Sequence, residues 1–70
     1  MDAAQRFGHN LRLARRAKQM RQEDLASRVY LDRTAISKVE TGNRYPRLDH
    51  IIEFADALDV RVRDLLYGIV

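Results

Sequence analysis

Residues Gln22–Glu40 read QEDLASRVYLDRTAISKVE and decide the fold of this chain. Apolar residues recur in this stretch at spacings of three and four, which predicts two short amphipathic helices. Tyr30 and Leu31 form a tight turn between the two helices, with Leu31 reaching back toward the core. Asp32 can then cap the free backbone amides at the start of the second helix. The stretch therefore predicts two short helices that meet at a turn.

The second of these helices, over about residues 33–41, has a buried side and a polar side. Ile36 and Val39 are its inward residues, as Leu25 and Val29 are in the helix before it. Gly42 is expected to end this helix as a C′ glycine. The side chains left on its outer face are Arg33, Thr34, Ser37 and Lys38.

The fold class is predicted to be all-α, because no strand-like alternation persists along the chain. We expect three more helices, at about residues 3–18, 48–58 and 62–66. On the first of them, a buried face is expected to contain Phe7, Leu11, Ala14 and Ala17. The apolar residues of the fourth helix along the chain are Leu48, Ile51, Ile52, Ala55 and Leu58.

Length and composition limit what the chain can be. Seventy residues predict a single domain with one small core. The chain has no cysteine, hence no disulfide or thiolate metal site, and a reducing cytoplasm suits it. It also lacks an apolar run near the ~20 residues that cross a bilayer, and it has no apolar signal stretch at its start.

Charge is divided unevenly along the chain. Residues 1–47 hold 11 Lys and Arg against 5 Asp and Glu, whereas residues 48–70 hold 2 Arg against 5 acidic residues. The net charges are therefore +6 and −3, which give the overall +3. This division is consistent with one surface for a polyanion such as nucleic acid and another for a different partner. An alternative is that the arginines only keep a small helical domain in solution.

With these residues at this spacing, the chain resembles the phage-repressor and Cro-like helix-turn-helix transcription regulators, the XRE-type domain. The resemblance covers about residues 7–66 and implies a five-helix, lambda-repressor-like domain that usually binds operator DNA as a homodimer. It implies a helix-turn-helix over about 22–41 and dimerisation through residues 48–70. The matching residues are Phe7-Gly8, Leu11-Arg12, Arg15, Gln22-Glu23, Leu25-Ala26, Ile36-Ser37, Val39-Glu40, Gly42, Pro46, Ala55, Leu58 and Leu65-Leu66.

The chain departs from the family at four turn or cap positions. Gln19, Tyr30 and Asp59 occupy turn positions where the family usually has glycine, and Arg21 replaces a usual Ser or Thr cap. Tyr30 is the most notable, because the turn often needs a positive φ there. A tyrosine in that conformation carries strain, and an aspartate carries less.

The resemblance places the helix of residues 33–41 in the major groove of DNA. Arg33 and Lys38 have donors suited to guanine O6 and N7, and Thr34 offers a methyl or a hydroxyl group. Ser37 is short and would contact a base only at close approach. Without the surrounding motif, these four side chains would be read as an ordinary solvated helix face.

Phosphate contacts are expected on both sides of this helix. Gln22 opens a helix N-terminus, where free amides favour an anion, and in the family it also braces the reading helix. Its alternative role is that of a plain first-turn residue. The loop after the reading helix can clamp the flanking strand. The predicted phosphate contacts are Gln22, Arg21, Asn43, Arg44 and Arg47.

Two further sets of residues have structural roles. By resemblance, Arg15 and Glu40 form an ion pair that ties the first helix to the end of the reading helix. The apolar C-terminal third exceeds what a small core readily hides, and exposed apolar patches mark interfaces. The expected dimer interface contains Ile52, Val62, Leu66, Tyr67 and Ile69. Alternatively, the tail folds back over its own core.

No metal or catalytic site is expected. His9 and His50 lack Cys, His or carboxylate partners at metal-like spacing. Asp49, Glu53 and Asp56 recur at helical spacing, as on a solvated face. The chain also lacks a nucleophile–base set and a phosphate-cradling glycine loop, so we do not expect an enzyme.

The sequence therefore predicts a sequence-specific, homodimeric DNA-binding regulator in the cytoplasm. No cofactor and no membrane contact are expected, and no small-molecule ligand is evident from the sequence. Phage repressors, restriction–modification controllers and antitoxins all fit, with the first two favoured because no toxin-binding segment is evident. The alternative is a protein-interaction module of the same fold with weak DNA specificity, and the cationic face of Arg33 and Lys38 argues against it.

Overall fold

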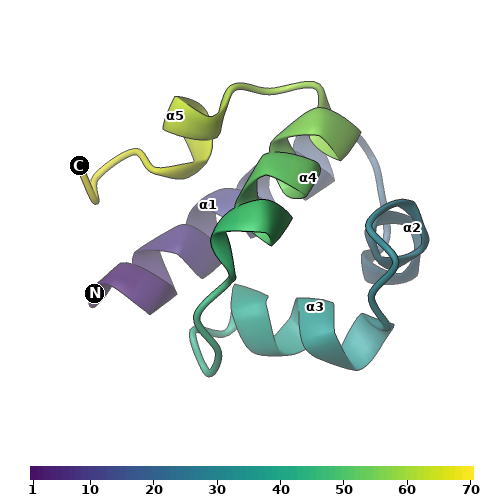
Figure 1. Cartoon of the computed structure of the whole chain (residues 1–70), viewed down its shortest axis with the longest axis horizontal. Helices are drawn as coiled ribbons and strands as arrows, with labels where there is room; N and C mark the ends of the chain where they lie inside the picture. Colours follow the sequence, from purple (N-terminus) through teal and green to yellow (C-terminus); the bar gives the residue numbers. More distant parts are fainter.

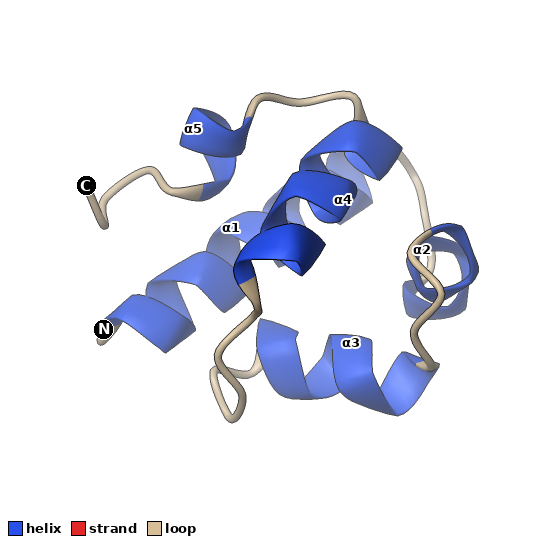
Figure 2. Cartoon of the chain, in the orientation of Figure 1, coloured by secondary structure: helices blue, strands red, loops and turns tan.

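The computed structural model describes all 70 residues as five α-helices without a strand (Figures 1 and 2). This confirms the predicted all-α class. The fourth helix has the expected bounds, and the first, third and fifth each end one residue earlier than expected. The helices are α1 (Ala3–Ala17), α2 (Gln22–Arg28), α3 (Arg33–Glu40), α4 (Leu48–Leu58) and α5 (Val62–Leu65).

Helix α1 is the centre of the arrangement, because it packs against α3, α4 and α5. Helix α2 packs against α3 and α4. In Figure 1, α3 lies along the lower edge of the molecule, with the other helices on one side of it only. One side of α3 is therefore buried and the opposite side faces solvent. None of the five helices combines the length and apolarity that crossing a bilayer requires.

The core takes at least one fully buried side chain from every helix. Phe54 of α4 is at its centre, with its ring centroid 6.3 Å from that of Phe7. Burying a side chain of this size stabilises the fold by roughly 1.5–3 kcal/mol relative to leaving it exposed. The residues with no more than 1 % exposure are Leu11, Leu25, Ile36, Phe54, Leu58 and Leu65.

The buried faces of α1 and α4 differ in part from the prediction. Ala17 was expected to be buried and is exposed, because it is the last residue of α1. On α4, Leu48 and Ile52 are 73 % and 54 % exposed, respectively. They form a separate stripe one turn apart, whereas Phe54 and Leu58, four residues apart, point into the core. The sequence alone shows that α4 is apolar on two sides, but not which side is buried.

Four helices end in the same way, with one residue in the left-handed conformation. Gln19, Tyr30 and Asp59 have φ of 57°, 57° and 53°, and Gly42 has 79°. This confirms the expectation that the glycine-like turn positions need a positive φ. After α2, the Leu31 amide donates to the Ala26 carbonyl at 3.0 Å, which closes a Schellman turn.

An apolar side chain follows the left-handed residue at three of these helix ends. Met20, Leu31 and Val60 are half-buried and pack against the core. Leu31 therefore does reach back into the core as expected. The hydrogen bonds of the turn and this apolar contact together offset the strain of a non-glycine residue in the left-handed region.

Helices α1 and α3 approach each other closely at Gly8. A Cβ at this position would lie 2.3 Å from the carbonyl oxygen of Val39 and 2.6 Å from that of Glu40. Both atoms belong to the backbone of α3, so they cannot move aside as a side chain would. Glycine is therefore required here by the close approach of the backbones and not by a turn.

We predict that Gly8→Ala lowers the free energy of unfolding by about 1–3 kcal/mol, the usual cost of overpacking a core. A loss of stability is informative, because helix propensity alone favours alanine over glycine by roughly 1 kcal/mol and would predict a gain. Urea denaturation measures the change, with His9→Ala, an exposed neighbour on α1, as the control. A Gly8→Ala variant as stable as the parent would contradict the proposed close contact.

Candidate nucleic-acid interface

The outer face of α3 carries two cationic side chains, Arg33 and Lys38. Arg33, Thr34 and Lys38 are exposed and Ser37 is half-buried. The Asp32 carboxylate accepts a hydrogen bond of 2.8 Å from the Ala35 amide and so caps the helix, as expected. The structure thus brings the four predicted base-contact residues to one face of a capped helix.

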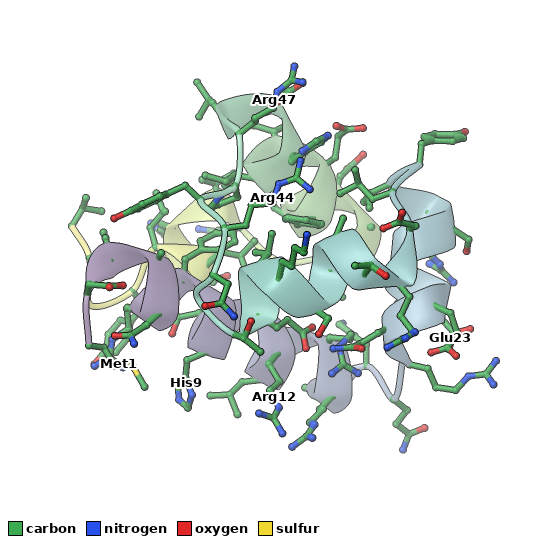
Figure 3. All side chains as sticks on the ribbon, turned by 90° about the horizontal axis from the view of Figure 1, so that it is seen from below. Met1, His9, Arg12, Glu23, Arg44 and Arg47 are labelled. Atoms are coloured by element: carbon green, nitrogen blue, oxygen red, sulfur yellow. The ribbon has the colours of Figure 1, made fainter.

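Three cations around this face have no acidic partner in the protein. Arg33, Lys38 and Arg44 form no ion pair, whereas ion pairs occur at Arg15, Arg21 and Arg47. Figure 3 looks onto α3 from below and shows Arg44 and Arg47 on one side of it. Positive charge that is exposed and unpaired is available to an anionic ligand.

Three other predicted phosphate contacts already have internal partners. Arg47 donates to Asp49 at 3.0 Å, and the Asn43 amide donates to the Thr41 hydroxyl at 3.0 Å. Arg21 pairs with Asp24 at 3.2 Å, and these hydrogen bonds lower the pKa of the Asp24 carboxyl. Such exposed contacts contribute little free energy, so they can exchange for a phosphate.

Gln22 joins this surface to two buried charged residues, Arg15 and Glu40. Its side-chain amide donates to Oε1 of Glu40 at 3.1 Å, which links the start of α2 to the end of α3. Glu40 also accepts from Arg15, through Nε at 2.6 Å and Nη2 at 3.0 Å. The side chains of Arg15 and Glu40 are 9 % and 3 % exposed.

The polar atoms of this cluster are satisfied. The remaining Arg15 nitrogen, Nη1, donates to the Met20 carbonyl at 2.7 Å, and no buried side-chain nitrogen or oxygen lacks a partner. The hydrogen bonds to Glu40 raise the pKa of Arg15 above its ordinary value. We call Arg15, Glu40 and Gln22 the buried polar cluster.

The residues expected at a dimer interface lie in different places on the structure. Ile52 and Val62 line a shallow depression between α4 and the start of α5, together with Val60. Tyr67 lines a different depression, beside Leu13 of α1. The dimer interface stays a prediction, and the structure divides its residues between two depressions and the core.

The chain end folds back onto α1, as the alternative interpretation had it. The Asn10 side chain donates to the carbonyls of Leu65 and Tyr67, both at 2.8 Å. Leu66 and Ile69 are half-buried and pack against the core. These two residues therefore have an internal partner already, whereas Ile52 of α4 is 54 % exposed.

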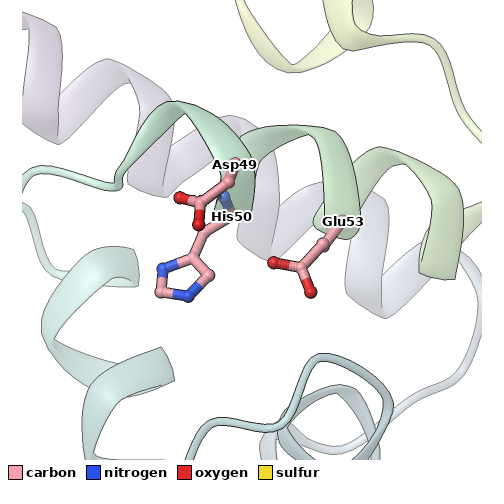
Figure 4. A group of neighbouring side chains, drawn as sticks. All are labelled: Asp49, His50 and Glu53. Carbon is pink, nitrogen blue, oxygen red and sulfur yellow. Dashed lines mark hydrogen bonds between the residues drawn. The ribbon is translucent and has the colours of Figure 1, made fainter.

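The prediction for His50 also needs correction. Ligand atoms of Asp49, His50 and Glu53 lie within 4.8 Å of one another on one side of α4 (Figure 4). His50 and Glu53 are three residues apart and so share a helix face. Asp49 accepts hydrogen bonds from Arg47 and from the His50 amide, so both of its oxygens are engaged. His9 is exposed on α1, as expected.

Tyr30 was treated above only as a turn residue, yet it borders the cationic face. It lines one shallow depression with Thr34, Lys38 and Arg44. The signal available in the sequence was the replacement of a usual turn glycine by a large aromatic residue.

Comparison with known proteins is consistent with this geometry. Residues 11–65 match a family described as "Helix-turn-helix". The chain is 37 % identical over 62 residues to the HTH-type transcriptional activator BcrR of Enterococcus faecalis, covering 89 % of this chain but only 30 % of that protein. It is 44 % identical over 61 residues to control protein C.BamHI of Bacillus amyloliquefaciens, covering 86 % of this chain and 75 % of that one.

A solved structure of similar length has the same fold. The restriction-modification controller protein C.AhdI from Aeromonas hydrophila is 42 % identical, with a TM-score of 0.85. The match covers 89 % of this chain and 90 % of that protein. The similarity therefore extends over both the α2–α3 pair and the helices that support it.

We predict that Glu40→Ala lowers the free energy of unfolding by about 3–5 kcal/mol, because it leaves Arg15 buried without a counter-charge. The double variant Arg15→Met, Glu40→Leu should recover much of that loss, since neither charge then remains. Urea denaturation measures both, and Arg21→Ala, which breaks an exposed pair, is the control for a small effect. A double variant no more stable than Glu40→Ala would contradict the account.

Proposed function

This chain belongs to the helix-turn-helix family, and on that premise we propose that it is a transcriptional regulator that occupies operator DNA as a homodimer. The observation that carries the proposal is the outer face of α3. It presents Arg33 and Lys38 without internal partners, next to the unpaired Arg44. An exposed helix of this kind, with its opposite side buried, fits the major groove of B-DNA.

The side chains of α3 supply the sequence reading. Arg33 and Lys38 donate to guanine O6 and N7, which is the commonest specific contact in the major groove. Thr34 contacts a thymine methyl or a nearby phosphate, and half-buried Ser37 reaches only a base that comes close. Specificity therefore rests mainly on two cations at opposite ends of one face.

Phosphate contacts on two sides hold α3 in the groove. Arg44 and Arg47 follow α3 on one side, with Asn43 at the start of the same loop. Arg21 and the free amides at the start of α2 face the other strand, and Gln22 positions that helix end through the buried polar cluster. These contacts fix the register on DNA and carry no sequence information of their own.

The dimer is proposed to form through the Ile52–Val62 depression. Ile52 is 54 % exposed, and the depression is bordered by Val60 and by the acidic Asp56 and Asp59. This location keeps the acidic C-terminal third away from phosphate. A two-fold pairing places two copies of α3 about one DNA turn, roughly 34 Å, apart.

Among regulators of this fold, a restriction–modification controller is the role we favour. Support comes from the similarity to C.BamHI and C.AhdI, both described as control proteins, over 75 % and 90 % of their lengths. The chain covers only 30 % of the activator BcrR, so that similarity concerns its helix-turn-helix part.

Selection of binding sites from a random duplex pool at physiological salt tests the proposal. An enriched inverted repeat, with half-sites about one turn apart, is the expected result for a dimeric reader. Binding without an enriched motif would replace the proposal with a general DNA binder. If no duplex binds, the protein-interaction alternative takes its place.

We predict that Arg33→Ala or Lys38→Ala costs roughly 1–3 kcal/mol on the selected operator and relaxes one base position. Arg44→Ala is the matched control, because it removes an equal charge from a phosphate contact. It should weaken operator and random DNA alike and reduce the salt slope by about one. Equal losses on the two DNAs for Arg33→Ala would remove that residue from the base-reading set.

We predict that Ile52→Asp makes the protein monomeric, because the variant buries a charge in the proposed interface. Leu13→Asp is the matched control, since Leu13 is also 54 % exposed but lies beside Tyr67. Sedimentation measures both. Dissociation by Leu13→Asp, with Ile52→Asp still dimeric, would move the interface to the depression that contains Tyr67.

A further inference from the structure

Tyr30 occupies a backbone position that suits glycine better than tyrosine. Its φ is 57°, and it is the left-handed residue of the Schellman turn after α2. The left-handed region crowds Cβ against the following carbonyl oxygen, so a bulky residue is strained there. Strain alone does not mark a function, because Gln19 has the same φ at the end of α1.

The distinctive property of Tyr30 is the exposure of its ring. The residue is 91 % exposed, and its hydroxyl has no hydrogen-bond partner within the protein. The aromatic pairs of the structure involve Phe7, His50 and Phe54 and leave Tyr30 out. Contacts within the protein therefore do not explain why a tyrosine is present at this position.

The location of Tyr30 suggests what compensates for the strain. It lines the same depression as Thr34 and Lys38 of α3 and as Arg44 of the following loop. Asp32 also borders this depression, but its carboxylate caps α3 by accepting from the Ala35 amide. A phosphate held by Arg44 at this depression would lie beside the phenol of Tyr30.

We propose that the Tyr30 hydroxyl donates a hydrogen bond to a phosphate of the DNA strand that Arg44 contacts. This inference rests on the proposed DNA binding and adds a positioning contact to it. A phenol suits the task, because its O–H is a good donor to a phosphate oxygen and only two side-chain torsions must be fixed. The contact is neutral, so it releases no counterion of its own.

Three variants test the inference on the selected operator and on a random duplex, over a series of salt concentrations. Tyr30→Phe removes only the hydroxyl and keeps the strained backbone. Tyr30→Gly removes the whole side chain and relieves the strain, so its Tm should rise by a few degrees. Gln19→Gly is the matched control, because it relieves the same kind of strain in the turn after α1.

We expect Tyr30→Phe and Tyr30→Gly to raise Kd about five- to tenfold on both duplexes, which is the size of one typical, solvent-exposed hydrogen bond. The slope of log Kd against log salt should stay as in the parent, unlike that of Arg44→Ala. Gln19→Gly should have a higher Tm and the parent Kd. A variant that is more stable yet binds less tightly is not explained by a purely structural role.

Two results would overturn the inference while DNA binding itself stands. Tyr30→Phe binding as tightly as the parent would exclude the hydroxyl contact, even if Tyr30→Gly binds less tightly. Gln19→Gly losing as much affinity as the Tyr30 variants would trace the loss to turn geometry. A parent protein that binds neither duplex at any salt concentration would instead refute the proposed function, and the inference with it.

Discussion

The carboxylate of Glu40 connects three helices at one buried point. It is the last residue of α3, and it accepts from Arg15 of α1 and from Gln22 of α2. A charge buried this deeply is tolerated only with close opposite charge and full hydrogen bonding, and both conditions are met. The orientation of α3 relative to α2 therefore depends on contacts at the far ends of both helices, as well as on the turn between them.

The backbone contact at Gly8 acts on the same end of α3. The Val39 and Glu40 carbonyls face Gly8 so closely that a Cβ would not fit. The ion pair and the glycine contact therefore both tie α1 to the C-terminal half of α3. The side of α3 opposite this contact is left to solvent, and Arg33 and Lys38 are on that exposed surface.

Local features of the fold could be predicted because they depend on residues near one another in the sequence. The spacing of apolar residues predicted where the helices lie, and Asp32 marked the start of α3. Tyr30 was expected to have a positive φ. Periodicity alone did not predict the details of packing between distant residues. Examples are the burial of Phe54 at the core centre and the folding of the chain end onto Asn10.

The same distinction holds for the candidate site. The residue types on the outer face of α3 could be read from the sequence, since positions 33, 34, 37 and 38 share one side of a helix. The sequence could not show which cations already have partners. Arg47 pairs with Asp49 and Arg21 with Asp24, whereas Arg44 is unpaired. Those partnerships are set by side-chain conformations at turns and helix ends, where periodicity carries no information.

At the helix ends, the contacts that hold the turn do not involve the side chain of the left-handed residue. After α1 and α2, the turn is held by backbone hydrogen bonds and by the half-buried Met20 or Leu31. Neither interaction involves the side chain of the left-handed residue itself. The side chain at position 30 can therefore change without disturbing the buried polar cluster or the core, at a local cost of about 1–2 kcal/mol for a non-glycine residue. Because that cost is small and local, a fold held together on its buried side can accept a strained tyrosine on the side that faces a ligand.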